Sequence, residues 1–175
     1  GKIIYASDAS GSADIFEISP NGGDVRQLTS GMNRNYAPAV SPDNRFIAFH
    51  SNRSGVFQIW RMDRDGSNPV QLTFGNSESH WPEFTADGKF LIYEHFEPGQ
   101  SGTAWRVPVE GGKPVKIADG FAVRPELSRD GKWLGYWQND GQDKSPWRLA
   151  LFSLTENKQI RTFDLPSTVQ IGWDT

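Results

Sequence analysis

The chain has 175 residues, no cysteine and a formal net charge of −3, with both signs interspersed. These values exclude disulfides, thiolate metal sites and cysteine nucleophiles, and no basic patch indicates nucleic-acid binding. No apolar run approaches the ~18 residues of a membrane span, so we expect no membrane insertion by this segment. Seven Trp, eleven Phe and four Tyr provide large side chains for a core.

A repeat with a period of about 44 residues covers the whole chain. Its clearest copy runs from Tyr36 to Thr73. Moved by 44 positions, this copy places Phe49 on Tyr5 in one direction and on Tyr93 in the other. The boundaries of the four expected repeats within one propeller unit of 1–175 are approximately 1–30 plus 168–175, 31–74, 75–120 and 121–167.

Each repeat contains four short candidate strands joined by turns. In the second repeat we expect the strands at 37–40, 46–50, 57–62 and 70–73. The first turn, Ser41-Pro42-Asp43-Asn44, places Asn44 where Gly88 and Gly131 stand in later copies, which predicts a positive φ. Four antiparallel strands with tight turns, repeated radially, are typical of a β-propeller blade.

Aromatic residues recur at two positions of the repeat. Because a blade cannot bury both faces alone, we expect neighbouring blades to pack through these side chains. The residues are Tyr5, Phe49, Tyr93 and Tyr136 at one position, and Phe16, Trp60 and Trp105 at the other.

The first repeat begins at its second strand, near Ile3, and residues 169–174 resemble the missing first strand. We therefore expect an all-β, four-blade propeller whose C-terminal strand completes the first blade and removes two free edges. The alternative is that two chains form a homodimer, each contributing half of an eight-blade ring. Since Gly1 opens in the middle of a repeat, we also expect that the natural start of the protein is missing.

Several segments resemble the TolB-type (WD-like) β-propeller repeat over almost the whole chain. They are Ser41-Pro42-Asp43, Ser51-Asn52-Arg53-Ser54-Gly55, Gln58-Ile59-Trp60-Arg61-Met62, Asp65-Gly66-Ser67 and Gln71-Leu72-Thr73. The resemblance implies a bacterial, periplasmic or otherwise extracytoplasmic protein that binds partner proteins at its channel mouth. Similar repeats also form propellers of prolyl-oligopeptidase-type enzymes, tricorn-like proteases and sensors of transcription regulators, so the fold alone does not name the ligand.

Catalysis by this chain is not expected. The sequence contains no Gly-x-Ser-x-Gly motif, and His50 falls within a predicted strand, at the position of Ala6, Glu94 and Trp137 in other copies. Asp43, Asp87 and Asp130 occupy the same turn of successive repeats, which favours a role in turn formation over a facing pair of glycosidase carboxylates.

No metal or other cofactor is expected either. The segment 63–68 resembles the opening of a calcium loop, but no closing carboxylate follows, and a hairpin turn is the preferred interpretation. His80 and His95 have three glutamates near them in the sequence, without the spacing of a known metal site. Those glutamates are Glu78, Glu94 and Glu97.

Binding of a protein or peptide is the preferred function. The connections at 30–36, 74–81, 119–124 and 164–168 are expected to rim one face of the channel, and aromatic residues and arginine dominate interface energetics. The predicted binding residues are Arg34, Asn35, Tyr36, His80, Trp81, Phe121 and Arg124. For Trp81 and Arg124, which precede the proline of their repeats, filling of the channel is the alternative role.

The sequence therefore predicts a non-catalytic scaffold that recognises a protein or peptide through its channel-rim loops. Two alternatives stay open: the substrate-gating propeller of a larger prolyl-oligopeptidase-like or tricorn-like hydrolase, and the sensory propeller of a membrane-tethered regulator that binds a small molecule.

Overall fold

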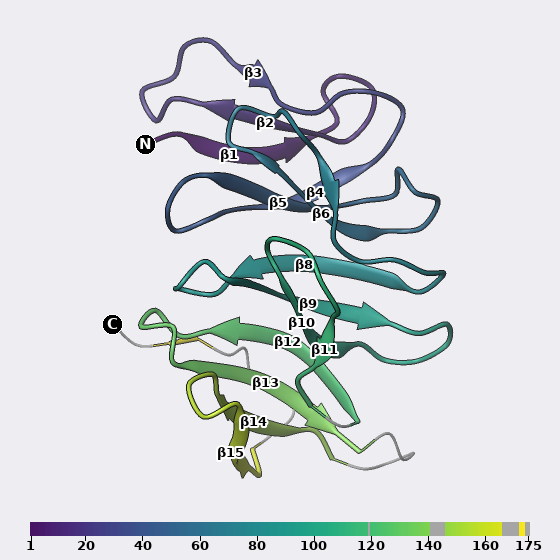
Figure 1. The fold of residues 1–175 in the computed structure, drawn as a ribbon, viewed down its shortest axis with the longest axis vertical. Coiled ribbons are helices and arrows are strands. Elements are labelled where there is room, and N and C mark those ends of the chain that lie inside the picture. Colours follow the sequence, from purple (N-terminus) through teal and green to yellow (C-terminus); the bar gives the residue numbers. More distant parts are fainter. Residues whose placement is uncertain (119, 141–145, 166–171, 174–175) are drawn as a thin grey trace.

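The computed structural model describes residues 1–118, 120–140, 146–165 and 172–173. Four antiparallel sheets follow one another in chain order along the longest axis of the molecule (Figure 1). This part of the chain contains no helix. Accordingly, it has no helix of the length and apolar character that crossing a membrane requires. The predicted all-β, propeller-type fold is confirmed.

The strand order repeats from sheet to sheet. The first sheet has three strands, β1 (Ile3–Ser7), β2 (Asp14–Ile18) and β3 (Arg26–Gln27). The other sheets have four strands each: β4 (Asn35–Val40), β5 (Phe46–Ser51), β6 (Gln58–Asp63) and β7 (Val70–Gln71); β8 (Glu78–Phe84), β9 (Phe90–Phe96), β10 (Thr103–Pro108) and β11 (Val115–Lys116); β12 (Phe121–Leu127), β13 (Trp133–Asn139), β14 (Arg148–Ser153) and β15 (Lys158–Phe163). As predicted, the first sheet starts with the second strand of the repeat.

The turn between the first and second strands of each four-stranded sheet is built from local hydrogen bonds. Ser41 Oγ donates to Asp43 Oδ1 at 2.7 Å and accepts the backbone N–H of Phe46 at 2.9 Å. The Ser41 hydroxyl lowers the pKa of the Asp43 carboxyl. Asn44 has a φ of 59°, close to the 68° of Gly88 at the equivalent position. The predicted turn role of these residues is confirmed.

Three hydrophobic clusters fill the spaces between consecutive sheets. Phe49 belongs to the cluster between the first and second sheets, Tyr93 to the next and Tyr136 to the last. All three side chains are fully buried. Trp60 and Trp105 are partly buried and pack against these clusters. The predicted stacking through repeated aromatic residues is therefore confirmed.

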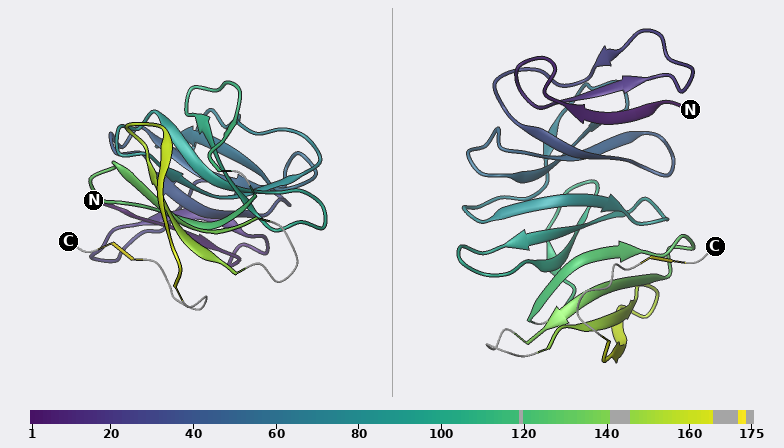
Figure 2. Two further views of the ribbon diagram at one scale, coloured as in Figure 1. Left: turned by 90° about the horizontal axis from the view of Figure 1, so that it is seen from below. Right: turned by 180° about the vertical axis from the view of Figure 1, so that it is seen from behind.

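The strand that was expected to complete the first sheet lies mostly outside the described residues. Of that segment, Trp173 is described, and its indole Nε1 donates to the carbonyl oxygen of Glu126 in β12 at 3.1 Å. Trp173 therefore contacts the fourth sheet, whereas ring closure required it beside β1. The reason is the arrangement of the sheets: the first and the fourth occupy opposite ends of the row in Figure 1 and in the right view of Figure 2. In the described residues the first sheet keeps three strands.

Candidate binding site on the inner strands

The first strand of each four-stranded sheet carries a β-bulge at its proline. We call these three strands, β4, β8 and β12, the inner strands. The register of β8 on β9 shifts between His80 and Glu83, so that Trp81 and Pro82 together oppose the single residue Tyr93. Because proline has no N–H to donate to the ladder, the pairing is interrupted at this point. The strands β4 and β12 bulge at the equivalent Pro38 and Pro125.

The residue before each proline has a left-handed backbone. The φ angles of Ala37, Trp81 and Arg124 are 48°, 50° and 52°. This conformation is rare for residues other than glycine and costs of order 1 kcal/mol, and it persists only where surrounding structure enforces it. The same strained position therefore recurs in three neighbouring strands.

A side chain from the preceding sheet holds the bulge at two of these positions. The backbone N–H of Trp81 donates to Nδ1 of His50, in β5, at 3.2 Å. The backbone N–H of Arg124 donates to Oε1 of Glu94, in β9. Both acceptors come from the second strand of the sheet before, so each bond joins two sheets.

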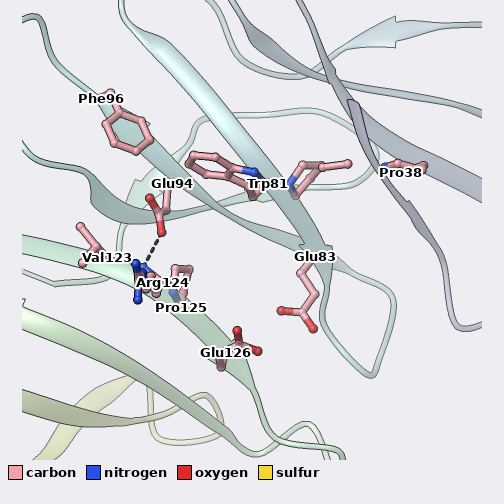
Figure 3. A pocket seen from close by; sticks show the side chains of 11 residues that line it. Pro38, Trp81, Glu83, Glu94, Phe96, Val123, Arg124, Pro125 and Glu126 are labelled. Carbon is pink, nitrogen blue, oxygen red and sulfur yellow. Dashed lines mark hydrogen bonds between the residues drawn. The ribbon is translucent and has the colours of Figure 1, made fainter. Parts of the chain in front are cut away.

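The bulged residues line a cavity of about 940 Å³ between the second, third and fourth sheets (Figure 3). Trp81 keeps 55% of its surface exposed, and Arg124 is exposed as well. The full lining comprises Ala37, Pro38, Trp81, Pro82, Glu83, Glu94, Phe96, Val123, Arg124, Pro125 and Glu126. Three strands with the same bulge thus present side chains of different chemistry to one space.

The charges in this cavity are predominantly negative. Glu83 and Glu126 lie on the same side of the cavity in Figure 3. Burial of its carboxyl group and, second, the charge of Glu126 raise the pKa of Glu83 to about 7. Part of the Glu83 side chain nevertheless stays open to the cavity. Burial also raises the pKa of Glu94, against the opposing effects of the Arg124 N–H and guanidinium.

Aromatic rings connect this cavity to a second one of about 500 Å³, because Trp81 and Phe96 line both. Their ring centroids are 5.9 Å apart with planes at 71°. His80 lies at the centre of the cluster, with its ring 4.8 Å from His50 and 5.1 Å from Trp81. These contacts fix the orientation of the exposed Trp81 indole.

The predicted binding residues do not all lie in connecting loops. Arg34 lies in the connection before β4, but the other six belong to the inner strands β4, β8 and β12. The placement of those six in rim loops was wrong because each first strand begins before the bulge, and the prediction started the strand at the bulge. The rim connections extend over 119 and 166–168 too, which are outside the described residues.

The structure brings only some of these residues together. Trp81 and Arg124 share the larger cavity, and His80 lines the smaller one. Tyr36 contacts the rings of His50 and Phe57 but lines neither cavity.

Three further predicted residues line neither cavity. Asn35 is fully buried, where its Nδ2 donates to Asp14 and its Oδ1 accepts from Arg53 at 2.9 Å. It therefore stabilises the sheets and is not open to a partner. Phe121, at the start of β12, and Arg34 do not line either cavity.

Sequence reasoning missed four residues of the site: Glu83, Glu94, Phe96 and Glu126. Glu83 and Glu126 each follow the proline of their repeat, where Ala39 stands in the second copy. The signal that could have identified Glu83 and Glu126 was their shared repeat position, in each case two residues after one already selected, Trp81 or Arg124.

Other sites considered from the sequence have structural roles. Asp63 accepts a hydrogen bond from Asn68 at 2.7 Å and Asp65 from Ser67 at 2.5 Å, as expected for a hairpin turn. His80 pairs with Glu78, and His95 pairs with Glu97. Within the described ranges, no three His, Asp or Glu side chains are grouped so that they could hold a metal ion.

The family described as the tricorn protease N-terminal β-propeller domain matches residues 2–166. No curated protein matches the chain.

Several solved structures share the fold. The putative TolB from Agrobacterium tumefaciens has a TM-score of 0.75 and 24% identity, over 91% of this chain and 59% of that one. TolB from Acinetobacter baumannii has a TM-score of 0.69 and 25% identity, over 88% of this chain and 38% of that one. Dipeptidyl peptidase 4 from Porphyromonas gingivalis has a TM-score of 0.71 and 16% identity, over 87% of this chain and 22% of that one. The chain thus spans less than two thirds of each of these proteins.

Proposed function

Because the chain belongs to the tricorn protease N-terminal β-propeller family, we propose that it is a non-catalytic recognition module that binds a protein or peptide segment along its inner strands. The observation that carries the proposal is the cavity of about 940 Å³ to which bulged residues of three sheets contribute. Aromatic and arginine side chains supply most of the binding energy at protein interfaces, and both Trp81 and Arg124 are exposed there.

The strained backbone supports the same function. A left-handed residue before proline is costly, and such strain concentrates at functional sites. The hydrogen bonds that His50 and Glu94 accept hold Trp81 and Arg124 in place before any ligand arrives. A preorganised site loses less conformational entropy on binding.

His50 supports a non-catalytic role, because its Nδ1 already accepts the Trp81 N–H and is not available as a base.

Selection of phage-displayed random heptapeptides on the immobilised chain tests the proposal. Truncation of Trp81 to Ala is expected to weaken binding of the selected peptides about 30-fold, or about 2 kcal/mol. Phe74→Ala is the matched control, because Phe74 is 71% exposed and lines neither cavity. The proposal fails if Trp81→Ala leaves affinity unchanged, or if it lowers the melting temperature as much as the core variant Phe49→Ala.

A second candidate is the substrate-gating propeller of a larger peptidase. The family match and the likeness to the propeller-containing peptidase from P. gingivalis support it. The full-length gene distinguishes the candidates: an adjoining domain with Gly-x-Ser-x-Gly favours gating. A DNA-binding domain with a membrane span instead favours the sensory propeller of a regulator.

We propose an extracytoplasmic location for the chain, which the likeness to TolB supports.

We also propose that two chains can share one larger ring. The first sheet supports this arrangement, since it has three strands in the described residues and its edge at β1 leaves room for a strand supplied by a second copy. The mass in solution tests it. A doubled value relative to 19.6 kDa supports the shared ring, and the monomer mass at all concentrations contradicts it.

A further inference from the structure

The larger cavity contains more negative than positive charge. Three glutamates and one arginine line it. Arg124 is matched by Glu94, whose carboxyl group accepts its backbone N–H. Glu83 and Glu126 form no salt bridge with any residue in the described part of the chain, and only the backbone N–H of Leu127 opposes the raised pKa of Glu83.

Glu83 and Glu126 are placed side by side by the repeat itself. Each follows the proline of its bulge, in β8 and β12, and both line the cavity. Both carboxyl groups lie on the same side of the cavity in Figure 3, and burial together with the charge of Glu126 raises the pKa of Glu83, so the two groups repel each other. A positive group between them would relieve that repulsion.

The aromatic wall of the cavity favours the same kind of ligand. Trp81 is 55% exposed, and its ring is held by contacts with His80 and Phe96. The face of an indole attracts ammonium and guanidinium groups more strongly than any other aromatic side chain does. A metal ion is the weaker alternative, because no cluster of three His, Asp or Glu in the described ranges has the arrangement to hold one.

Building on the proposed function, we propose that this cavity selects peptides that carry an organic cation, placing an ammonium or guanidinium group between Glu83 and Glu126 and against Trp81. The cation is a lysine or arginine side chain or a free amino terminus, and these sources share one chemistry. The peptide chain itself extends along the inner strands.

Arrays of random heptapeptides test this selectivity. Four sets are N-acetylated and carry Lys, Arg, Gln or Glu at a fixed central position, and a fifth set has a free amino terminus and no Lys or Arg. We expect the Lys and Arg sets, the free-amine set, or both to be retained at least tenfold better than the Gln set, with the Glu set weakest. The pattern identifies which source supplies the cation.

Charge-neutralising variants then locate the site. Glu83→Gln and Glu126→Gln are each expected to weaken a retained cationic peptide about tenfold, while its neutral Gln counterpart is unaffected. Glu156→Gln is the matched control, because it changes net charge equally in the exposed turn between β14 and β15 and is expected to have no effect.

The outcomes separate the two proposals. Equal retention of the Lys, Arg, Gln and free-amine sets overturns the cation inference and leaves peptide recognition standing. Retention of no set contradicts both. Cationic binding that Glu83→Gln and Glu126→Gln leave unchanged overturns the assignment to this cavity.

Discussion

The junction between the second and third sheets and the junction between the third and fourth use the same backbone geometry with different chemistry. At the first, the N–H of a left-handed residue donates to the imidazole of His50, and burial lowers the pKa of His50 to about 3. At the second, the N–H donates to the carboxyl group of Glu94, whose pKa burial raises. The repeat therefore fixes the position of the acceptor and leaves its charge free to differ.

The two junctions respond to pH in opposite directions. His50 is neutral in the folded chain, so the unfolded chain binds its proton more readily, and stability is lost as the pH falls below about 6.5 toward 3. The pKa of Glu94 is raised on folding, so its contribution is present at low pH and is lost as the pH rises through the folded pKa.

The largest expected effect is on the pH dependence of the His50 junction. His50→Gln retains an acceptor that does not titrate. Between pH 7 and pH 4 the free energy of unfolding of the wild type is expected to fall by about 3 kcal/mol relative to this variant. Urea unfolding at several pH values measures the difference. Between pH 7 and pH 4 the free energy of unfolding of the wild type should instead rise relative to Glu94→Gln. If the difference between wild type and variant changes with pH in the same direction for His50→Gln and Glu94→Gln, the comparison is contradicted.

The next effect concerns the carboxyl acceptor at neutral pH. Glu94→Ala leaves the Arg124 N–H without its acceptor and is expected to lower the free energy of unfolding by about 2 kcal/mol. Glu94→Gln keeps an oxygen in place and should cost less than about 1 kcal/mol. Guanidinium chloride unfolding measures both. Equal losses for the two variants would show that the hydrogen bond is not what stabilises this junction.

The smallest effect is expected at the junction between the first and second sheets. There Ala6 occupies the position of His50 and Glu94, and it has no side chain that could accept the N–H of Ala37. Ala6→His is expected to raise the free energy of unfolding by about 1 kcal/mol by supplying that acceptor. Ala6→Leu is the control, because it adds similar volume without an acceptor. If thermal unfolding gives the two variants equal stability, an acceptor for the Ala37 N–H does not stabilise this junction.

The fold could be predicted from the sequence because its signals are local or periodic. The turn at Ser41–Asn44 depends on residues within a few positions of one another, and its hydrogen bonds are the predicted ones. The period of the aromatic residues likewise identified the packing of Phe49 and Tyr93 between sheets.

The site was harder to predict because its geometry depends on distant residues. A proline near the start of a strand indicates a strand end. The strand instead continues through Pro82, since His50, 31 residues away from Trp81, holds the bulge. The contact of Trp173 was missed for a similar reason: sequence pattern assigns a strand type but not the neighbour with which a terminal segment pairs.

The left-handed position before each proline also has a practical use. The β-bulge places Ala37, Trp81 and Arg124 in this conformation, and at Trp81 and Arg124 an acceptor in another sheet holds it. The position already accommodates a methyl group, an indole and a guanidinium. Side chains can therefore be exchanged at these three points without redesign of the surrounding strands. A small combinatorial library restricted to them would convert this scaffold into a family of engineered binders with altered ligand preference.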